Sequence, residues 1–501
     1  MPRSTTPGLP AIGGPPKRWP TAAGPQPRAS ARLPGAALSA LVAALLSAGC
    51  SSLAPEATLG PLQQRLSASD APGGRAQLQR DAASRAAAAQ ALDALLAGPL
   101  DADGAVRAAL LASPALQALL AEGWAADLDQ QIAARPPLLR LGWERLAGSA
   151  SPELTRSIGL SLTDLVLWPA RQRAAELGQA SNRLQLAQQV LTQAQRVRQR
   201  WVLAVADRER LGHQQRLRDA ADAGAELAQR MLAAGHFSRL QRDRETLLQA
   251  DAAAQQARAE QAATASREAL VRAIGLSPAQ ALRLRLPEHL AELPAALPAA
   301  LRDQAQTASL LAQRLDVAVA AAALAQQLGA PALAASAGVD LDAELLRKQL
   351  GDERSRGLAL GLAVPLGATA SAQRQALDAR SLAAAQRLAA LQSEADSQLR
   401  ERLAGWRSAH ALALHAQQEL LPLRQRMLDD TLLRANGMLA SVFELLGEAR
   451  GQLGAVISAT EARRDFWLAD AALQAAIDGV GVDAPPAASA TTPAGAEPAG
   501  P

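Results

Sequence analysis

Apolar and polar residues alternate along two short stretches of this chain, residues 157–163 and residues 357–364. Alternation with a period of two is typical of a strand that has one apolar and one polar face. The apolar positions of these two predicted strands are Ile158, Leu160, Leu162, Leu358, Leu360 and Leu362. Because the stretches share this pattern and lie about 200 residues apart, they indicate an internal duplication.

Two further stretches with the same alternation precede these strands. Leu139, Leu141 and Trp143 alternate with polar or small residues, and residues 333–341 show the pattern in the second half. Between the second pair of strands, residues 351–356 are predicted to form a charged loop. We therefore expect four strands, arranged as two pairs.

Long helical patterns follow each pair of strands. Pro169 and Pro365 stand where these helices are expected to begin, since proline is favoured in the first helical turn. Residues 170–234 contain no proline and carry a heptad-like apolar seam. A helix of about 65 residues would measure about 100 Å, which no globular core requires. Residues 370–434 are expected to form the corresponding helix of the second half.

A glycine interrupts each long helix, and a second helical pattern follows it. Gly235 precedes a pattern over residues 238–275, and Gly437 precedes one over residues 440–477. Glycine permits the left-handed backbone that ends and reverses a helix. We therefore predict a mainly α fold with two long antiparallel helical hairpins of the α-barrel or coiled-coil kind, joined to four strands.

The landmarks recur in the same order at nearly one spacing, which predicts a tandem structural duplication. The predicted organisation is a signal segment at residues 1–50, a tether with a modest helix at 51–100, a first repeat at 101–280, a linker at 281–300, a second repeat at 301–480 and a disordered tail at 481–501.

The composition of the chain agrees with a fold of long, packed helices. Hydrophobic residues make up 49% of the 501 residues, but aromatic residues only 2%, with no tyrosine, which suits long helices better than an aromatic-rich core. The net charge is +4, and arginine alternates with acidic residues along the helices. We interpret these charges as a solvated face and expect no nucleic-acid partner.

The N-terminal segment has the order of an export signal. Arg28 and Arg32 precede an apolar run at residues 33–46, and small residues then lead to Cys50, the single cysteine. The segment resembles a bacterial lipoprotein signal, in which Cys50 becomes the lipidated first residue of the mature chain. The alternative is an ordinary cleaved signal with a chance cysteine. No other apolar run reaches the about 20 residues of a membrane-spanning helix, so a membrane would be crossed by strands of a closed barrel.

Several pieces of the chain resemble the TolC-type outer-membrane factors, the outer membrane efflux protein family, in its lipoprotein branch. The resemblance covers about residues 101–479. The pieces that carry it are Ser113–Leu116 in the opening helix, Arg314–Val317 in the second copy, the strand GLALGLAVPLG, the turn sequence GHFSRLQRDRETLLQA and the C-terminal stretch RANGMLASVFELLGEARGQLGAVISATEARRDFWLADAALQAAI.

The resemblance implies a homotrimer in the outer membrane, with its helical part in the periplasm and a lipid anchor at Cys50. Each protomer would give four strands to one β-barrel and four helical stretches to one tunnel. Three copies make twelve strands, an even number within the known range of such barrels. The trimer would conduct solutes passively from periplasm to exterior in a tripartite efflux or type I secretion system. Its partners would be a periplasmic adaptor (membrane fusion protein) and an inner-membrane pump.

The resemblance also implies three groups of site residues. The hairpin tips that contact the adaptor would include Gly235, Ser238, Leu240, Gly437, Ala440 and Val442. Candidates for a periplasmic aperture are Phe443, Glu444, Leu446 and Glu448, although a glutamate on a helix is usually only solvated. The lipid-facing strand residues would be Ile158, Leu160, Leu162, Leu358, Leu360 and Leu362. Trp143 and Trp168 lie near strands, where packing at a strand end and a membrane-interface role are both open.

Nothing in the sequence indicates an enzyme. Five scattered histidines and one cysteine give no usual metal site, and no phosphate-binding loop, dinucleotide fingerprint or nucleophile elbow occurs, so we expect no cofactor. An acidic and basic run at residues 242–245 is interpreted as an ion network on a hairpin face. The alternative function is that of a soluble periplasmic coiled-coil lipoprotein, acting as an adaptor or spacer. That alternative leaves the two matched pairs of strands unexplained.

Overall fold

The computed structural model describes residues 55–68, 75–146, 153–294, 313–333, 339–350, 352–364 and 369–481. All of them belong to one compact unit, Ala54–Pro501. The predictions for the signal segment, for Cys50, for Pro365 and for all but the first residue of the tail lie outside the described residues. The predicted strands and long helices lie almost wholly within them.

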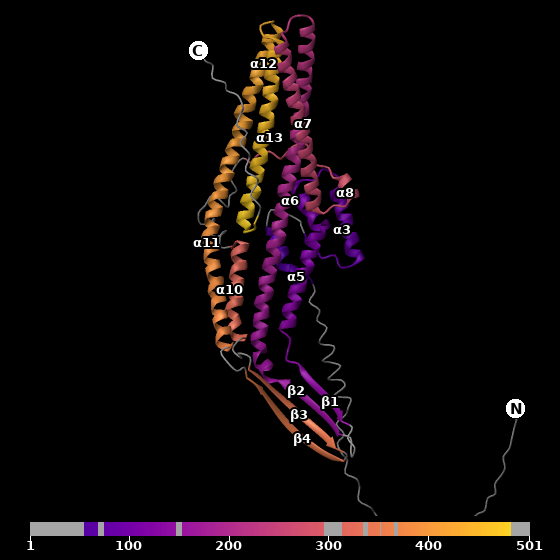
Figure 1. Ribbon diagram of the computed structural model, residues 1–501, viewed down its shortest axis with the longest axis vertical. Helices are drawn as coiled ribbons and strands as arrows, with labels where there is room; N and C mark the ends of the chain where they lie inside the picture. Colours follow the sequence, from indigo (N-terminus) through magenta and orange to yellow (C-terminus); the bar gives the residue numbers. More distant parts are fainter. Residues whose placement is uncertain are drawn as a thin grey trace, which may run out of the picture. The chain divides into compact units, whose positions relative to one another are not determined.

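Four strands form one antiparallel sheet in the order β1-β2-β3-β4 (Figure 1). They are β1 (Leu139–Leu146), β2 (Glu153–Ser161), β3 (Asp340–Leu350) and β4 (Glu353–Ala363). The pairing of β2 with β3 places Leu160 opposite Ala343 and so joins the two halves of the chain in one sheet. The four predicted strands and their grouping into two pairs are confirmed.

The predicted position of the third strand is wrong. Residues 333–341 were expected to be extended, but helix α10 (Leu315–Leu333) continues through Pro331, and β3 begins only at Asp340. The α10 segment is rich in alanine, the strongest helix former, and this preference outweighs the weak alternation at its end. The strand then runs to Leu350, so most of the predicted charged loop belongs to β4.

The start of the first long helix also differs from the prediction. Helix α6 (Leu162–Ala233) begins at Leu162 and not at Pro169, which lies inside it. The Ser161 hydroxyl accepts a hydrogen bond from the amide of Asp164 at 3.3 Å, and Asp164 places a negative charge at the positive end of the helix dipole. This cap starts the helix two turns early. Leu162 is therefore helical and is not a lipid-facing strand residue as predicted.

Two antiparallel hairpins follow the sheet, as predicted. The first consists of α6, with 72 residues and so about 110 Å long, and α7 (Arg239–Ile274). In the second, α11 (Thr369–His415), the π-helical turn η3 (Ala416–Leu420) and α12 (Leu421–Asn436) lead to the tip, and α13 (Val442–Asp478) returns. The strands thus lie at one end of these helices and the two hairpin turns at the other (Figure 1).

The core surrounds the middle of α6. It includes helices α2 (Pro55–Ala68), α3 (Ala82–Leu95), α4 (Ala102–Ala112) and α5 (Pro114–Ala133). The largest fully buried side chains of this cluster are Leu62, Leu66, Val106, Leu120, Val190, Val197, Val205, Leu270, Ile274 and Leu315. The modest helix expected in the tether is present as α2 and α3, and leucines of both helices pack into the main core. The short helix α8 (Pro278–Arg283) crosses the predicted boundary at residue 280 between the first repeat and the linker.

No single helix among the described residues has both the length and the apolarity needed to cross a membrane. The bent pair α4 and α5, which meet at 60°, reaches that threshold only when the two helices are taken together, by length and composition alone.

Candidate functional sites in the sheet and at the hairpin tips

The sheet has one apolar face that is open to the surroundings. The strand register places Leu139 opposite Leu160, and Leu345 opposite both Ile158 and Leu358. We call this surface the apolar face; its residues are Leu139, Leu141, Trp143, Ile158, Leu160, Leu341, Ala343, Leu345, Leu358, Leu360 and Leu362. Trp143 is 77% exposed and Leu360 64%. A contiguous apolar surface of this kind marks a contact with lipid or with another protein.

Side chains on the opposite, polar face are mostly small or charged. A Cβ added to Gly142 would meet the Ser157 hydroxyl, which shows that these neighbours share this face. Its ionisable residues are Arg140, Glu144, Glu153, Asp340, Asp342, Glu344, Lys348 and Glu353. Arg140 lies 3.9 Å from Asp342, and Lys348 pairs with Glu153. Acidic groups therefore outnumber basic ones on this face.

Each outer strand of the sheet is paired on one side only within the described residues. β1 bonds to β2 and β4 bonds to β3, so β1 and β4 are the edges. An unpaired edge presents free amide and carbonyl groups, which natural proteins cover or pair. β1 runs away from the helices and β4 runs back toward them, so these edges have the opposite directions that antiparallel pairing between copies requires.

The first hairpin tip is built as predicted. Gly235 has φ +77, the left-handed region, and the amide of His236 donates to the Met231 carbonyl at 2.9 Å. This is the six-residue hydrogen bond of a glycine-ended helix. Ser238 then begins α7 with a reciprocal cap, in which its hydroxyl accepts from the Gln241 amide.

The second tip corrects the prediction for Gly437. That glycine has φ −81, and the left-handed residue is Met438, with φ 59. The amide of Leu439 donates to the Arg434 carbonyl at 2.8 Å, so the same six-residue bond forms one residue later than the glycine would place it. Met438 is 94% exposed. A side chain there costs about 1–2 kcal/mol in backbone conformation.

The two tips contact one another through an aromatic pair. The rings of Phe237 and Phe443 stack with their centroids 4.6 Å apart. Phe443, a predicted aperture residue, therefore packs within its own chain. Below it, the Arg450 guanidinium lies 2.7 Å from the Glu245 carboxylate, both largely buried, and this pair supports the predicted ion network on the hairpin face.

The acidic aperture candidates are paired with arginines of α12. Glu444 lies 3.9 Å from Arg434, and Glu448 lies 4.0 Å from Arg424. Leu446 is half-buried on the same helix. These distances are long and the groups are partly solvated, so each pair contributes little stability.

A buried carboxylate in the core escaped the sequence analysis. Glu209 of α6 is only 4% exposed; its Oε1 lies 3.1 Å from His289 Nδ1 and 3.1 Å from an Arg463 nitrogen. His213 Nε2 is 3.9 Å away, beyond hydrogen-bond distance. Burial alone would raise the pKa of Glu209, but the neighbouring His213, Arg463 and His289 outweigh it and lower the pKa to about 2. The spacing of Glu209 and His213, one helical turn apart, was the available signal.

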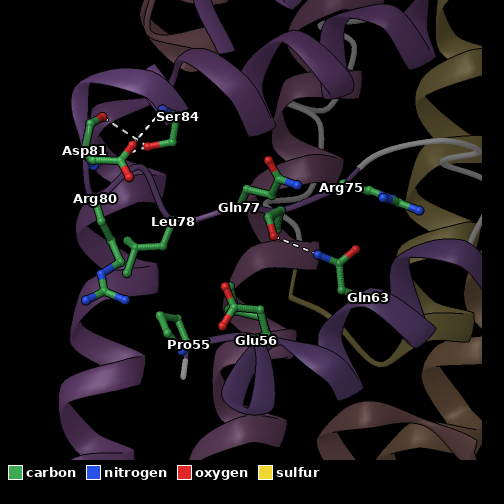
Figure 2. A pocket seen from close by; sticks show the side chains of 11 residues that line it. Pro55, Glu56, Gln63, Arg75, Gln77, Leu78, Arg80, Asp81 and Ser84 are labelled. Carbon is green, nitrogen blue, oxygen red and sulfur yellow. Dashed lines mark hydrogen bonds between the residues drawn. The ribbon is translucent and has the colours of Figure 1, made fainter. Parts of the chain in front are cut away.

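A separate open cleft of about 920 Å³ lies between the start of α2 and residues 75–84. Figure 2 shows Gln63 donating to the Ala76 carbonyl and Asp81 bonded to Ser84 at its rim. These bonds hold α2 and the N-terminus of α3 in place. No sheet or tip residue lines this cleft.

The two tryptophans near the strands differ in their surroundings. Trp168 donates to the Ala134 carbonyl at 3.1 Å, as packing at a strand end requires, whereas Trp143 is exposed.

Solved structures similar to this one are membrane proteins. A membrane protein from Pseudomonas aeruginosa matches with a TM-score of 0.63 and 18% identity, over 77% of this chain and 94% of its own. The Campylobacter jejuni CmeC outer membrane channel matches at 0.60 and 13%, over 78% and 85%. The Vibrio cholerae outer membrane protein VceC matches at 0.60 and 16%, over 78% and 97%.

No protein-family model and no curated protein matches the sequence. The likeness is therefore one of fold. The chain has the fold of these outer-membrane proteins, which confirms the TolC-type architecture expected from the sequence, including long helical hairpins and four strands in tandem pairs. The lipoprotein branch stays a prediction.

Proposed function

We propose that this protein is the outer-membrane channel component of a tripartite efflux or type I secretion system. The observation that carries the proposal is the sheet, whose exposed apolar face and two unpaired edges lie at the end of helices about 110 Å long. In a membrane, open strand edges are not tolerated and must pair. The chain would conduct solutes passively, and we assign it no catalytic role.

Three copies would remove the open edges. β4 of one copy would pair with β1 of the next in the antiparallel sense that the strand directions allow, giving a closed ring of twelve strands. The apolar face would meet lipid, through Ile158, Leu160, Leu358, Leu360 and Leu362 among others. The polar face, with Ser157, Gly159 and the acidic residues, would line the pore.

The tips would lie at the far, periplasmic end and contact the adaptor of an inner-membrane pump. Their exposed surface includes Gly235, Ser238, Leu240, Gly437, Met438 and Val442, and the half-buried Ala440 lies beside them. Glu444, Leu446 and Glu448 would narrow the periplasmic aperture next to the Phe237–Phe443 pair. Lipidation of Cys50 would anchor the chain in addition to the barrel. Each repeat would supply two strands and one helical hairpin, with the boundaries between the repeats near residues 280 and 300.

The test is to express the full chain in a Gram-negative host and to fractionate the membranes. We expect an outer-membrane protein that needs detergent for extraction, that runs as a heat-modifiable trimer and that forms pores in planar bilayers. A monomer released by salt or carbonate without detergent would favour the periplasmic spacer and overturn the channel.

A variant separates these outcomes further. Leu360→Lys, on the apolar face, should strongly impair stable insertion, because a lysine that faces lipid near the middle of the bilayer costs about 2–4 kcal/mol. Gly361→Lys, its neighbour on the polar face, would lie opposite Asp342 and should leave insertion intact. Equal behaviour of the two variants would contradict the assignment of the faces.

A further inference from the structure

The apolar face ends in a band of arginines at the end of the sheet that is farthest from the helices. The register aligns Trp143, Arg156, Arg347 and Arg356 in one row across all four strands. The next row outward holds Arg145 and Arg354 at the two edges. We call these five residues the arginine band: Arg145, Arg156, Arg347, Arg354 and Arg356.

The charges of the two faces are sharply divided. All five arginines are exposed, and none has an ion-pair or hydrogen-bond partner among the described residues. No acidic residue of the four strands shares their face. On the polar face, by contrast, both Arg140 and Lys348 are paired with carboxylates. An unpaired cluster of guanidinium groups on one face calls for an external anion.

The band lies at a definite level of the sheet. Arg356 precedes Leu358 by two residues on β4, so it lies about 7 Å farther along the strand from the helices. The apolar rows through Leu358, Leu360 and Leu362 separate it from the helices. Strands of this length span a bilayer when tilted, so a band near their outer ends falls at the level of the headgroups. Arginine is tolerated at this interface and disfavoured at the bilayer centre.

We propose that the arginine band binds the phosphate groups of lipid A in the outer leaflet surrounding the channel. This inference rests on the proposed function, since it requires the sheet to lie in an outer membrane with its hairpins outward. Guanidinium groups match phosphate oxygens in paired, charge-assisted hydrogen bonds. In a trimer the band would recur three times and form a basic girdle.

The experiment compares retention of lipid A by the purified, detergent-solubilised full chain, measured by native mass spectrometry and by lipid titration. The probes are bisphosphorylated lipid A, the same lipid without phosphates, and phosphatidylglycerol. We expect wild type to prefer bisphosphorylated lipid A by at least about tenfold and to lose this preference at high salt. The variant R156Q/R347Q/R356Q should bind it about a hundredfold more weakly, at about fivefold for each arginine.

The matched control is R374Q/R380Q/R387Q, which removes three exposed arginines of α11 with the same change of charge. It should bind lipid A as wild type does. Should the first triple variant fail to assemble, R347Q alone and the dephosphorylated lipid test the same claim on assembled protein, with an expected fivefold loss for the single variant.

Failure of the proposed lipid site and failure of the proposed channel function give different results in these experiments. A trimer that inserts and conducts but binds the phosphate-free lipid equally well, or whose triple variant retains lipid A, overturns the lipid site alone. Equal binding of phosphatidylglycerol overturns the commitment to lipid A. A chain that neither inserts nor trimerises overturns the proposed function itself.

Discussion

Each half of the chain builds two strands and a helical tip, but the two halves connect their strands to their tips by different helices. In the first half, α6 runs without interruption over Leu162–Ala233. In the second, the same path is broken by the π-helical turn at Ala416–Leu420, directly before Pro422. Proline has no amide to donate and its ring crowds the carbonyl four residues earlier, so the helix widens by one residue there. The two halves therefore share the path of the backbone, but the second half departs from α-helical hydrogen bonding at this turn.

The helices that lead from the sheet to the tips, α6 in the first half and α11 with α12 in the second, also differ in how much of their apolar surface is covered. On α6 only Leu165 and Val166, near the sheet, are exposed among the large hydrophobic residues. The exposed set on α11 and α12 is Leu382, Leu412, Leu423, Met427, Leu432 and Leu433. Helices α2 to α5 pack around the first half. The second half lacks such a cover among the described residues, so α11 and α12 leave more apolar surface exposed than α6 does.

The largest expected effect contrasts a leucine from each half. Leu186 on α6 is 3% exposed and Leu382 on α11 is 62% exposed. Leu186→Ala should lower the free energy of unfolding by about 2–5 kcal/mol, through lost burial and a cavity. Leu382→Ala should change it by less than about 0.5 kcal/mol in the separated protomer. Denaturant unfolding of the solubilised protein measures both, and equal losses would remove the distinction between the halves.

The Glu209 cluster joins the halves, and its effect depends on pH. Its folded pKa of about 2 lies below the ordinary value of 4.5, so this carboxylate contributes stability above about pH 4.5 and loses it as the pH falls toward 2. A shift of this size corresponds to about 3 kcal/mol. Wild type should lose that much between pH 4.5 and 2, while Glu209→Gln should be less stable at pH 7 and flatter over this range. A parallel pH profile for both proteins would refute the assignment.

Short-range patterns predicted the parts of the fold that depend on one face of one element. The leucines of β2 and β4 alternate because one face of the sheet is apolar and the other polar, and that pattern is visible in seven residues. Alternation alone could not place β3, because the pattern begins at Leu333, the last residue of α10, and continues through Asp340 and Asp342 of the strand. The neighbouring alanine-rich segment drew the prediction away from it.

Contacts between distant residues escaped the sequence analysis. Glu209 meets His289 and Arg463 across 80 and 254 residues of chain, and no local spacing reports such a meeting. The arginine band likewise emerges only from the register, which aligns residues of four strands. At the second tip the sequence predicts the left-handed conformation at Gly437, whereas the turn places it at Met438. Glycine permits that conformation but does not fix its position.

A smaller effect is expected at the break in the second half. Pro422→Ala restores an amide, and we expect a gain of about 1–2 kcal/mol in unfolding free energy, less than the full interior cost of proline because the π-helical turn already accommodates it. The matched control is Pro169→Ala in α6, where no π-helical turn precedes the proline. The unfolding midpoint and the far-ultraviolet helix signal measure the change. A loss of stability in Pro422→Ala would mean that the turn is itself required.

The smallest effect is expected at the two tips, where one substitution should raise the local stability and the other should lower it. Met438→Gly places glycine at a left-handed position and should stabilise the second tip by about 1 kcal/mol. Gly235→Ala introduces a side chain at the equivalent position of the first tip and should destabilise it by about the same amount. Hydrogen exchange of the tip amides reports both changes locally, with Gly437→Ala as a control expected near zero, since its φ is −81. If Gly437→Ala proved the most damaging of the three, the left-handed residue of the second tip would be the glycine after all, and the tips would be alike.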